Sequence, residues 1–396
     1  MKKLTLLSLV TACALYAGGY KIPETSTNGV ALSAANVAHV YRADAAYYNP
    51  ANMSFMKDQH EIEVDLLSIS LDGTHFEGKN SQSGDSINAK KEHFFIPSIN
   101  YVSPKVGNFT FGLSTVVPGG LTKRWTDSPA KDKAEEFSLT VIELNPSLAY
   151  KVSETFAVAL GLRVLYSEGV VKSSAAISRD MTGKGVDYGY NLALAYKPLS
   201  SLELALTYRS EVTLNEEGTA KLYSPTGLVY DGGSSVSIPL PAILNVAVAY
   251  TFETKTTLEA VYERSFWSAY DTLDFNYATS IGNLTTNFDD PIAKNWEDTS
   301  AYRLGITQEL EKMTLMAGIV YDNTPVPDSK LSYELPDSNS LAVSLGGRYQ
   351  LTESMNLGLS ALYSMRENRD VKNSDIEGTF SNSDVLIISA GVGYTF

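Results

Sequence analysis

The chain has 396 residues, including 24 tyrosines, three tryptophans and a single cysteine, and its formal net charge is −14. So acidic a chain is a poor partner for nucleic acid, whose phosphates select basic surfaces. After the N-terminal leader the sequence has no apolar run long enough for a membrane-spanning helix. The length suits one large β-barrel better than one small soluble β domain.

Residues 1–17 predict a secretory signal peptide, because two lysines precede a short apolar run that is followed by small residues. We expect cleavage after Ala17, with Ala14 as the alternative position. Cys13 lies in a stretch that also resembles a lipoprotein cleavage site, so lipidation of this residue stays open. Without lipidation the mature chain has no cysteine and therefore no disulfide.

The segment 18–57 differs from the rest of the chain because its residues do not alternate as in a strand. Small residues between Gly29 and Val40 are compatible with one or two short helices. Asn49-Pro50 predicts a turn, since proline disfavours a helical conformation in the residue before it. We expect this compact segment to be a hatch that plugs the lumen of a barrel formed by residues 58–396.

From residue 58 onward, apolar residues recur at every second position in runs of about ten residues, which is the length of a tilted transmembrane strand. The run 341–351 is typical, and the final run ends in Phe396, like the assembly signal of outer-membrane barrels. Such strands must close on themselves, because no unpaired sheet edge can face lipid. The expected fold class is all-β: a transmembrane antiparallel β-barrel of about 14 strands.

The connections between these runs alternate between short turns and long polar segments. Short turns follow strands that end in tyrosine, for example at Tyr150 and Tyr349. This asymmetry and the terminal tyrosines are typical of outer-membrane barrels. A secreted β-sandwich, the soluble alternative, would show the same alternation without them. The expected long loops are 71–92, 118–136, 176–186, 215–235, 271–298 and 367–383.

Several short motifs follow one another along the chain: Gly18-Gly19-Tyr20, Tyr48-Asn49-Pro50-Ala51, Phe111-Gly112-Leu113, Pro118-Gly119-Gly120-Leu121, residues 206–212 (LTYRSEV), Phe266-Trp267-Ser268, residues 301–305 (AYRLG) and residues 321–327 (YDNTPVP). In their order these motifs resemble the FadL/TodX family of channels for hydrophobic compounds. The resemblance covers nearly the whole mature chain and implies transport of long-chain fatty acids or other apolar molecules across the outer membrane of a Gram-negative bacterium. It also implies a hatch in the lumen and a kinked third strand that opens a lateral gap.

The resemblance assigns roles to specific residues. The third strand is expected at 108–117, and the alternative for its glycines is the start of an ordinary loop. The hatch and gate residues are Gly18, Gly19, Tyr20, Asn49, Pro50 and Ala51. The residues that weaken strand pairing at the kink are Gly112, Pro118, Gly119 and Gly120.

Capture of a fatty acid requires an apolar groove for its tail, since each buried CH₂ is worth about 0.8 kcal/mol. Leu121, Trp125 and Phe137 could provide this groove, although an ordinary exposed loop is an equal alternative. A carboxylate head requires a cation, and Lys294 lies where the resemblance implies one. The second basic position, expected near 170–174, is not matched, although Lys172 lies there. An uncharged hydrocarbon or aromatic substrate therefore stays open.

Four arginines alternate with outward apolar residues and are expected to point into the lumen: Arg163, Arg209, Arg303 and Arg348. Arg209 and Arg303 are also candidates for substrate binding. For most of the four we favour internal pairing with inward carboxylates such as Glu203, Glu259 and Glu263.

Other classes fit less well. The four histidines show no nucleophile or metal-ligand spacing, so we expect no enzyme, no cofactor and no metal. A general porin would not need a hatch, while an adhesin or receptor role is compatible with transport. The expected partners are the apolar molecule and outer-membrane lipid, including lipopolysaccharide, and the expected state is a monomer.

Overall fold

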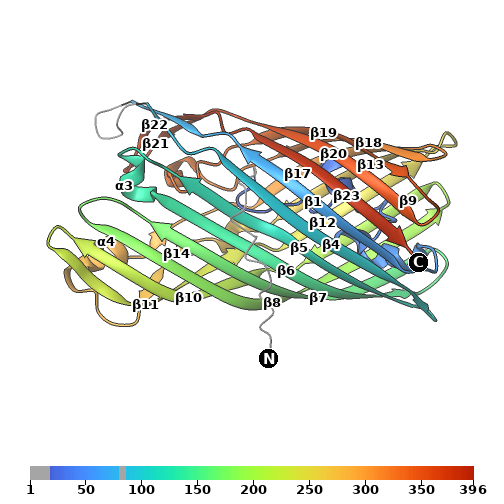
Figure 1. Ribbon diagram of the computed structural model, residues 1–396, viewed down its shortest axis with the longest axis horizontal. Coiled ribbons are helices and arrows are strands. Elements are labelled where there is room, and N and C mark those ends of the chain that lie inside the picture. Colours follow the sequence, from blue (N-terminus) through green and yellow to red (C-terminus); the bar gives the residue numbers. More distant parts are fainter. Residues whose placement is uncertain (1–17, 80–85) are drawn as a thin grey trace.

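The computed structural model describes residues 18–79 and 86–396, so the predicted signal peptide lies outside the described residues. The first strand, β1 (Glu61–Leu71), pairs with the last, β23 (Val385–Thr395), in antiparallel register along its whole length. This pairing closes the sheet into a barrel of inclined strands (Figure 1). The all-β antiparallel barrel predicted from the sequence is confirmed, and closure leaves no sheet edge to face lipid.

The wall contains 14 strands, which confirms the expected count. Two of them are interrupted, so that β9 continues into β10 and β11 continues into β12. Between β1 and β23 the wall order is β4 (Glu92–Val106), β5 (Phe109–Arg124), β6 (Glu136–Lys151), β7 (Phe156–Lys172), β8 (Ser178–Leu199), β9 (Leu202–Arg209) with β10 (Val212–Ser224), β11 (Gly227–Leu240) with β12 (Ile243–Thr251), β13 (Thr256–Ser265), β17 (Thr299–Glu309), β18 (Met313–Asp322), β19 (Ser340–Gln350) and β20 (Met355–Arg366).

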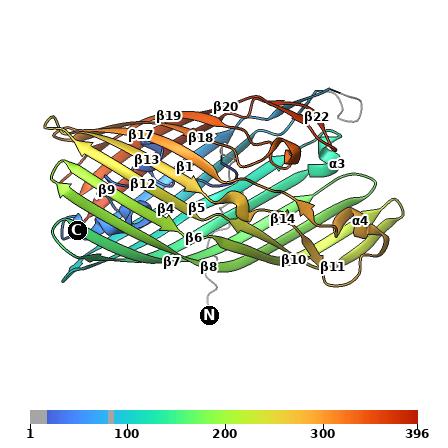
Figure 2. The same cartoon turned by 180° about the vertical axis from the view of Figure 1, so that it is seen from behind.

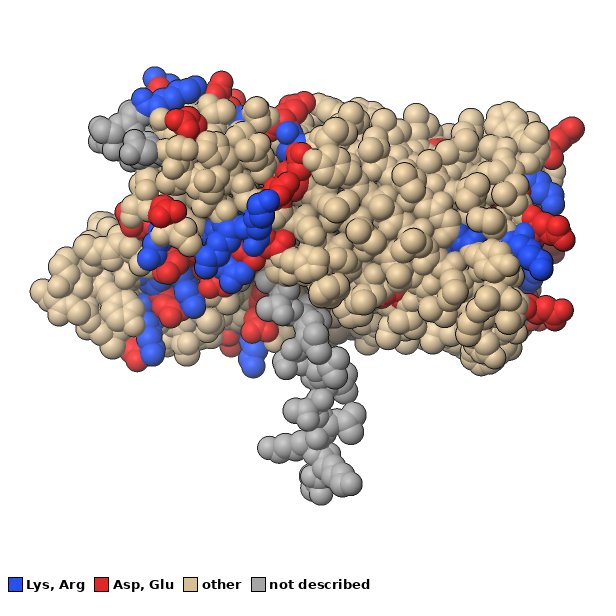
Figure 3. All heavy atoms as spheres, turned by 45° about the horizontal axis from the view of Figure 1, so that its top comes forward, with Lys and Arg blue, Asp and Glu red and all other residues tan. Residues whose placement is uncertain are grey.

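The outer face of the wall is apolar. On β19, Leu341, Val343 and Leu345 are exposed, whereas the alternating Ala342 and Ser344 are buried. Figure 3 shows a broad uncharged band on this side of the barrel, with charged side chains gathered towards the two ends. Exposed leucines and valines over such an area are stable only against the hydrocarbon of a bilayer.

The two ends of the barrel differ, as the loop lengths predicted. One end has short turns, such as 152–155 and 252–255. No described helix is long and apolar enough to span a membrane. The other end of the barrel carries the longer connections. Its elements are β2 (His75–Gly78), β3 (Ile87–Asn88), α3 (Ala130–Ala134), η2 (Trp267–Ala269), β14 (Thr272–Leu273), β15 (Phe275–Tyr277), η3 (Gly282–Leu284), α4 (Thr285–Phe288), β16 (Ile292–Ala293), η4 (Asp328–Lys330), β21 (Arg369–Lys372) and β22 (Glu377–Ser381).

Two of the predicted long loops are wrong. Most of 176–186 belongs to β8, and most of 215–235 belongs to β10 and β11. These strands continue beyond the apolar band, where their outer faces no longer meet hydrocarbon. Polar residues and glycines in that region are compatible with either a strand or a loop, so composition alone could not distinguish the two.

The segment 18–57 packs against the inner faces of the wall strands, and almost all of its residues are buried (Figure 2). It contains α1 (Thr27–Ala31), α2 (Ala45–Tyr48) and the 3₁₀ helix η1 (Pro50–Phe55). Helix α1 contacts β18, β19, β20 and β23, whereas η1 contacts β5, β6, β7 and β8 on another part of the wall. The segment therefore bridges the lumen.

Candidate functional site

The Asn-Pro-Ala turn begins the 3₁₀ helix η1. The side-chain oxygen of Asn49 accepts a hydrogen bond from the N–H of Ala51 at 3.1 Å. Pro50 occupies the first position of the helix, where its fixed φ fits and its missing N–H is not needed. The Asn49 amide donates to the carbonyl of Val37 at 2.8 Å, so this one residue joins two parts of the N-terminal segment.

A wall carboxylate holds the middle of the same segment. Glu259 on β13 accepts from the backbone N–H groups of Val37 and Ala38, each at 2.6 Å. Glu259 was expected to pair with a lumen arginine. Instead it receives backbone donors that would otherwise be buried without partners.

The backbone pairing of the wall is irregular along the third strand, β5. Its pairing with β4 stops at Thr115, which faces Ile99, and its register with β6 shifts between Val116 and Gly119. Residues 116–123 are then buried on both faces, so this stretch of β5 lies away from the membrane surface. The strand also continues to Arg124, well past the predicted end at residue 117.

The N-terminal residues occupy the edge of β5 that β4 leaves free. The N–H of Ile22 donates to the carbonyl of Pro118, and the N–H of Gly120 donates to the carbonyl of Tyr20, both at 2.8 Å. A Cβ on Gly119 would approach that Tyr20 carbonyl to 3.0 Å, so the close contact favours glycine. Lateral opening of the wall between β4 and β5, which we call the β4–β5 seam, would therefore require residues 20–22 to move away from β5.

Gly112 lies beside a second irregularity in the β4–β5 ladder. It pairs with Val102 on β4 and with Ser147 on β6, and the β4–β5 register shifts directly beyond this rung, between Val102 and Lys105. A Cβ at this position would meet the sulfur of Met53 at 2.5 Å. The absence of a side chain here thus makes room for η1.

Tyr20 connects the N-terminal segment to an aromatic cluster at the long-loop end. Its ring lies 4.7 Å from that of Trp267 and 5.7 Å from that of Trp296, centroid to centroid. The preceding Gly19 has φ +80°, and its N–H donates to the Asp337 carboxylate at 3.1 Å. A Cβ on Gly19 would meet the Trp267 ring at 2.6 Å, so glycine is required both by conformation and by space.

The apolar candidates for substrate capture belong to the same buried cluster. Leu121 and Trp125 are almost fully buried, and Trp125 donates from its indole nitrogen to the carbonyl of Tyr333 at 2.9 Å. The alternative of an ordinary exposed loop is therefore wrong for these two side chains.

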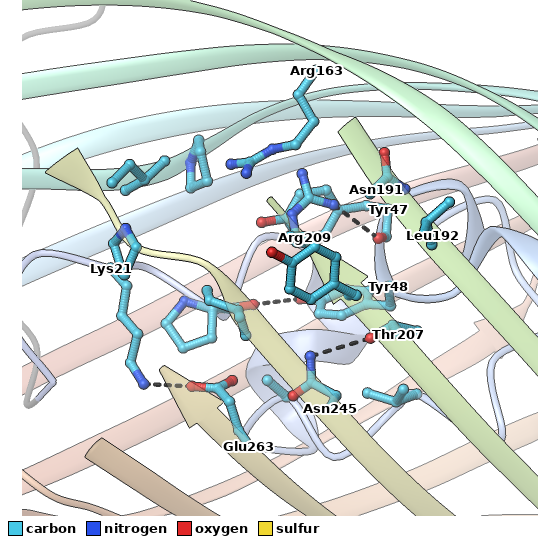
Figure 4. A pocket seen from close by; sticks show the side chains of 18 of the residues that line it. Lys21, Tyr47, Tyr48, Arg163, Asn191, Leu192, Thr207, Arg209, Asn245 and Glu263 are labelled. Atoms are coloured by element: carbon cyan, nitrogen blue, oxygen red, sulfur yellow. Dashed lines mark hydrogen bonds and ion pairs between the residues drawn. The ribbon is translucent and has the colours of Figure 1, made fainter. Parts of the chain in front are cut away.

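The lumen arginines are held by carboxylates. Arg163 and Arg209 share Glu143, and the Arg209 guanidinium also lies 4.3 Å from the ring centroid of Tyr47 in α2 (Figure 4). Arg303 pairs with Glu263 at 3.2 Å. Arg303 also donates to the carbonyl of Ser33 at 2.9 Å, and its buried Nε has no acceptor among the described residues.

Two more buried basic side chains, Lys21 and Arg348, also have carboxylate partners. Lys21 bonds to Glu263, and Arg348 pairs with Glu63 on β1. The expected carboxylate Glu203 faces His39 and Lys197 rather than an arginine.

Three basic residues at the long-loop end differ in environment. Lys172 lies between Glu136 and Asp180, at 3.7 and 3.8 Å, and is partly exposed. Lys294 and Arg179 are both 8% exposed, and among the described residues neither has a carboxylate oxygen within ion-pair distance. Arg179 instead lies over the ring of Phe275, 4.7 Å from its centroid, and its buried Nε has no hydrogen-bond acceptor in the described part of the chain.

Lys294 and Arg179 act on the same acidic side chain. Burial raises the pKa of Glu334, but the charges of Lys294 and Arg179 and a hydrogen bond from Ser332 bring the net pKa below its ordinary value. Two cations therefore face one carboxylate, which leaves one positive charge uncompensated. Sequence reasoning missed Arg179. This residue lies on β8 next to Asp180, which pairs with Lys172 on β7.

A closed β-barrel with an apolar outer band, an irregular wall strand and the segment 18–57 packed against its inner faces defines the class: an outer-membrane channel protein. The chain belongs to the family described as "Outer membrane protein transport protein (OMPP1/FadL/TodX)", whose sequence model matches residues 8–396. The protein is accordingly located in the outer membrane, and it belongs to a family of transport channels for hydrophobic compounds.

The chain is 26% identical to outer membrane protein P1 of Haemophilus influenzae, over 92% of this chain and 90% of that protein. It is 24% identical to the long-chain fatty acid transport protein of an Escherichia coli O6:H1 strain, over 93% and 91%. Among solved structures, a Pseudomonas aeruginosa FadL homologue shares the fold with a TM-score of 0.85 at 20% identity, over 95% of this chain and 99% of the other. The Pseudomonas putida toluene transporter TodX gives 0.69 at 16% identity, over 98% and 99%.

Proposed function

We propose that this protein conducts long-chain fatty acids from the cell exterior into the outer membrane. The observation that carries the proposal is the β4–β5 seam, which is open in its backbone pairing and covered by the protein's own N-terminal residues. An acyl chain gains nothing from a water-filled pore. It is transported favourably only if each site along its path removes it from water, at about 0.8 kcal/mol per buried CH₂.

The proposed route has three steps. The tail is captured in the aromatic cluster around Leu121 and Trp125. Contact of the ligand with Tyr20 shifts residues 18–22 away from β5, so that the segment 18–57 acts as a hatch. The molecule then leaves sideways between β4 and β5. The Asn49-Pro50-Ala51 turn holds the remainder of the hatch in place while its N-terminus moves.

We assign head-group recognition to Lys294 and Arg179. Both are buried cations without an ion-pair partner among the described residues, and a buried cation is stabilised by a carboxylate. A fatty acid would supply that carboxylate beside Glu334. Lys172, which already has two acidic neighbours, is not part of this site in our proposal.

The second candidate is a channel for uncharged hydrocarbons or aromatics, since TodX of Pseudomonas putida and TbuX of Ralstonia pickettii are toluene transporters. The tightly packed aromatic cluster would accept such molecules, but it would not explain two buried cations that face a single carboxylate. A general porin fits poorly because the lumen is blocked. We also propose that the protein acts as a monomer without catalytic activity and that its charged outer rim contacts lipopolysaccharide.

The test is uptake of radiolabelled oleate by cells with and without this protein, at limiting oleate, together with uptake of labelled toluene in the same strains. Loss of oleate uptake on deletion, restored by the intact gene, is the expected result. Loss of toluene uptake alone would select the second candidate. Unchanged uptake of both compounds would contradict the channel proposal.

A further inference from the structure

The wall is interrupted at a second place, away from the β4–β5 seam. The β9–β12 ladder ends at Arg209, which faces Ile243, and the β10–β11 ladder begins at Val212, which faces Leu240. Residues 210–211 on one strand and 241–242 on the other lie between these two ladders and are not paired with each other. Proline at position 241 has no N–H to donate, so a regular ladder could not pass through this level.

Other partners take up the freed backbone groups. The N–H of Ser210 donates to the carbonyl of Tyr190 at 2.9 Å, and the Ser210 carbonyl accepts from the Arg163 guanidinium. The carbonyl of Ala242 accepts from the N–H of Phe266 at 2.9 Å. Each strand is thus bonded to its neighbour on the far side, and the two strands are not bonded to one another at this level.

A cavity of about 60 Å³ lies directly behind this break (Figure 4). Tyr47, Tyr48 and Pro50 of the N-terminal segment line it on one side. Its lining also includes Leu192 and Tyr208, whose side chains are on the outer face of the wall. Its volume is that of about two water molecules, so an acyl chain could enter only after the N-terminal segment shifts.

An apolar groove of about 860 Å³ adjoins the cavity on the membrane side. Leu194 and Leu206 line the groove, each two residues from Leu192 and Tyr208 on the same strand face. The step between cavity and groove is therefore about 7 Å. Ala260 forms the floor, because it lies in register between the longer side chains of Val248 and Leu304.

We propose that this break is a second lateral opening, through which an acyl chain passes between the lumen and the groove on the membrane face. The inference rests on the proposed function, because it assumes that apolar molecules reach the lumen. The occupant of the groove is the acyl chain in transit: the groove is apolar, lies within the membrane-facing band and continues the cavity beside the hatch. No ladder hydrogen bond joins the two strands at this level, so the rungs that an opening would disturb first are the flanking pairs Arg209–Ile243 and Val212–Leu240.

The opening can be closed reversibly with a disulfide. Thr207 and Asn245 line the cavity, face each other across β9 and β12, and their side chains are hydrogen bonded at 3.2 Å. A T207C/N245C pair therefore has suitable geometry for a bond that stitches the strands beside the break. The matched control is T251C/T257C, whose hydroxyls are 2.8 Å apart at the short-turn end of β12 and β13. Disulfide formation and barrel folding are checked by mass spectrometry and by heat-dependent gel mobility.

We expect oxidised T207C/N245C to take up oleate at least twofold more slowly than the same protein after reduction, with no such change in the control pair. A260W, which fills the groove floor, should also slow uptake. A317W should not, because Ala317 is an outward-facing alanine outside the groove. Equal uptake in the oxidised and reduced forms, or equal slowing in both cysteine pairs, would overturn the second opening. If wild type itself moves neither oleate nor toluene, the proposed function fails instead.

Discussion

Gly120 donates its backbone N–H to the carbonyl of Tyr20 at 2.8 Å, so the segment 18–57 is bonded to the barrel wall through an isolated β-bridge between Lys21 and Gly119. Tyr20 at the same time packs against Trp267 in the aromatic cluster at the long-loop end. A ligand that displaces the Tyr20 ring would therefore pull on the hydrogen bonds that cover the β4–β5 seam. This connection links the proposed capture site to the proposed exit.

The first prediction concerns the strength of that connection. Gly119→Ala places a Cβ 3.0 Å from the Tyr20 carbonyl, whereas Gly233→Ala places one 3.4 Å from Ala278, an ordinary contact. We expect Gly119→Ala to weaken two backbone hydrogen bonds worth roughly 0.5–1.5 kcal/mol each. Amide exchange at Ile22 should then become about tenfold faster, measured by hydrogen–deuterium exchange. Unchanged exchange, or an equal change in Gly233→Ala, would contradict this role of the seam.

The barrel could be predicted from the sequence because a bilayer imposes one simple rule on every wall strand. Outward residues such as Leu341 and Leu345 must be apolar, so alternation repeats along the chain and can be counted. Beyond the bilayer the rule no longer applies. The parts of β8, β10 and β11 that extend beyond the bilayer at the long-loop end are for that reason predicted as loops from the sequence.

The candidate site was predicted less completely, because it joins segments that are distant in sequence. Lys294 was found through the family resemblance, but Arg179 on β8 and Glu334 in the connection between β18 and β19 meet only in three dimensions. Likewise, nothing in the sequence around Gly112 indicates that the pairing of β5 with β4 ends at Thr115. That position depends on where β4 stops pairing, which is a property of two strands together.

The second prediction concerns the charge cluster in the lumen. Glu143 is the shared partner of Arg163 and Arg209, and all three side chains are buried. Glu143→Gln leaves two buried guanidinium groups without a counter-charge, so we expect a loss of roughly 3–5 kcal/mol in the free energy of unfolding. Urea unfolding in lipid vesicles measures this loss. Glu154→Gln on an exposed turn is the control and should leave the urea midpoint unchanged; equal midpoints in both variants would contradict the structural role of Glu143.

The third prediction is a pH dependence at the long-loop end. Because the pKa of Glu334 is lowered in the folded protein, this carboxylate contributes stability above its unfolded pKa of about 4.3. That contribution is lost as the pH falls through the lower, folded pKa. We expect tryptophan fluorescence from the aromatic cluster to be constant between about pH 7 and pH 5 and to change below about pH 4. Glu334→Gln should remove this acid component, and an identical acid response in the variant would argue against it.

The fourth prediction separates the two lysines. Lys294 is buried without an ion-pair partner among the described residues, whereas Lys172 faces two carboxylates near the surface. Since a hydrogen bond to a charged group is worth roughly 1.5–3 kcal/mol, Lys294→Met should weaken oleate binding by at least about tenfold. Lys172→Met should change it less than twofold, and neither variant should alter binding of an uncharged alkane. Equal oleate affinities in wild type and Lys294→Met, measured by calorimetry with the purified barrel, would mean that the cation does not contact the carboxylate. Weakened binding of both oleate and the alkane would instead mean that the substitution disturbs the packing of the aromatic cluster.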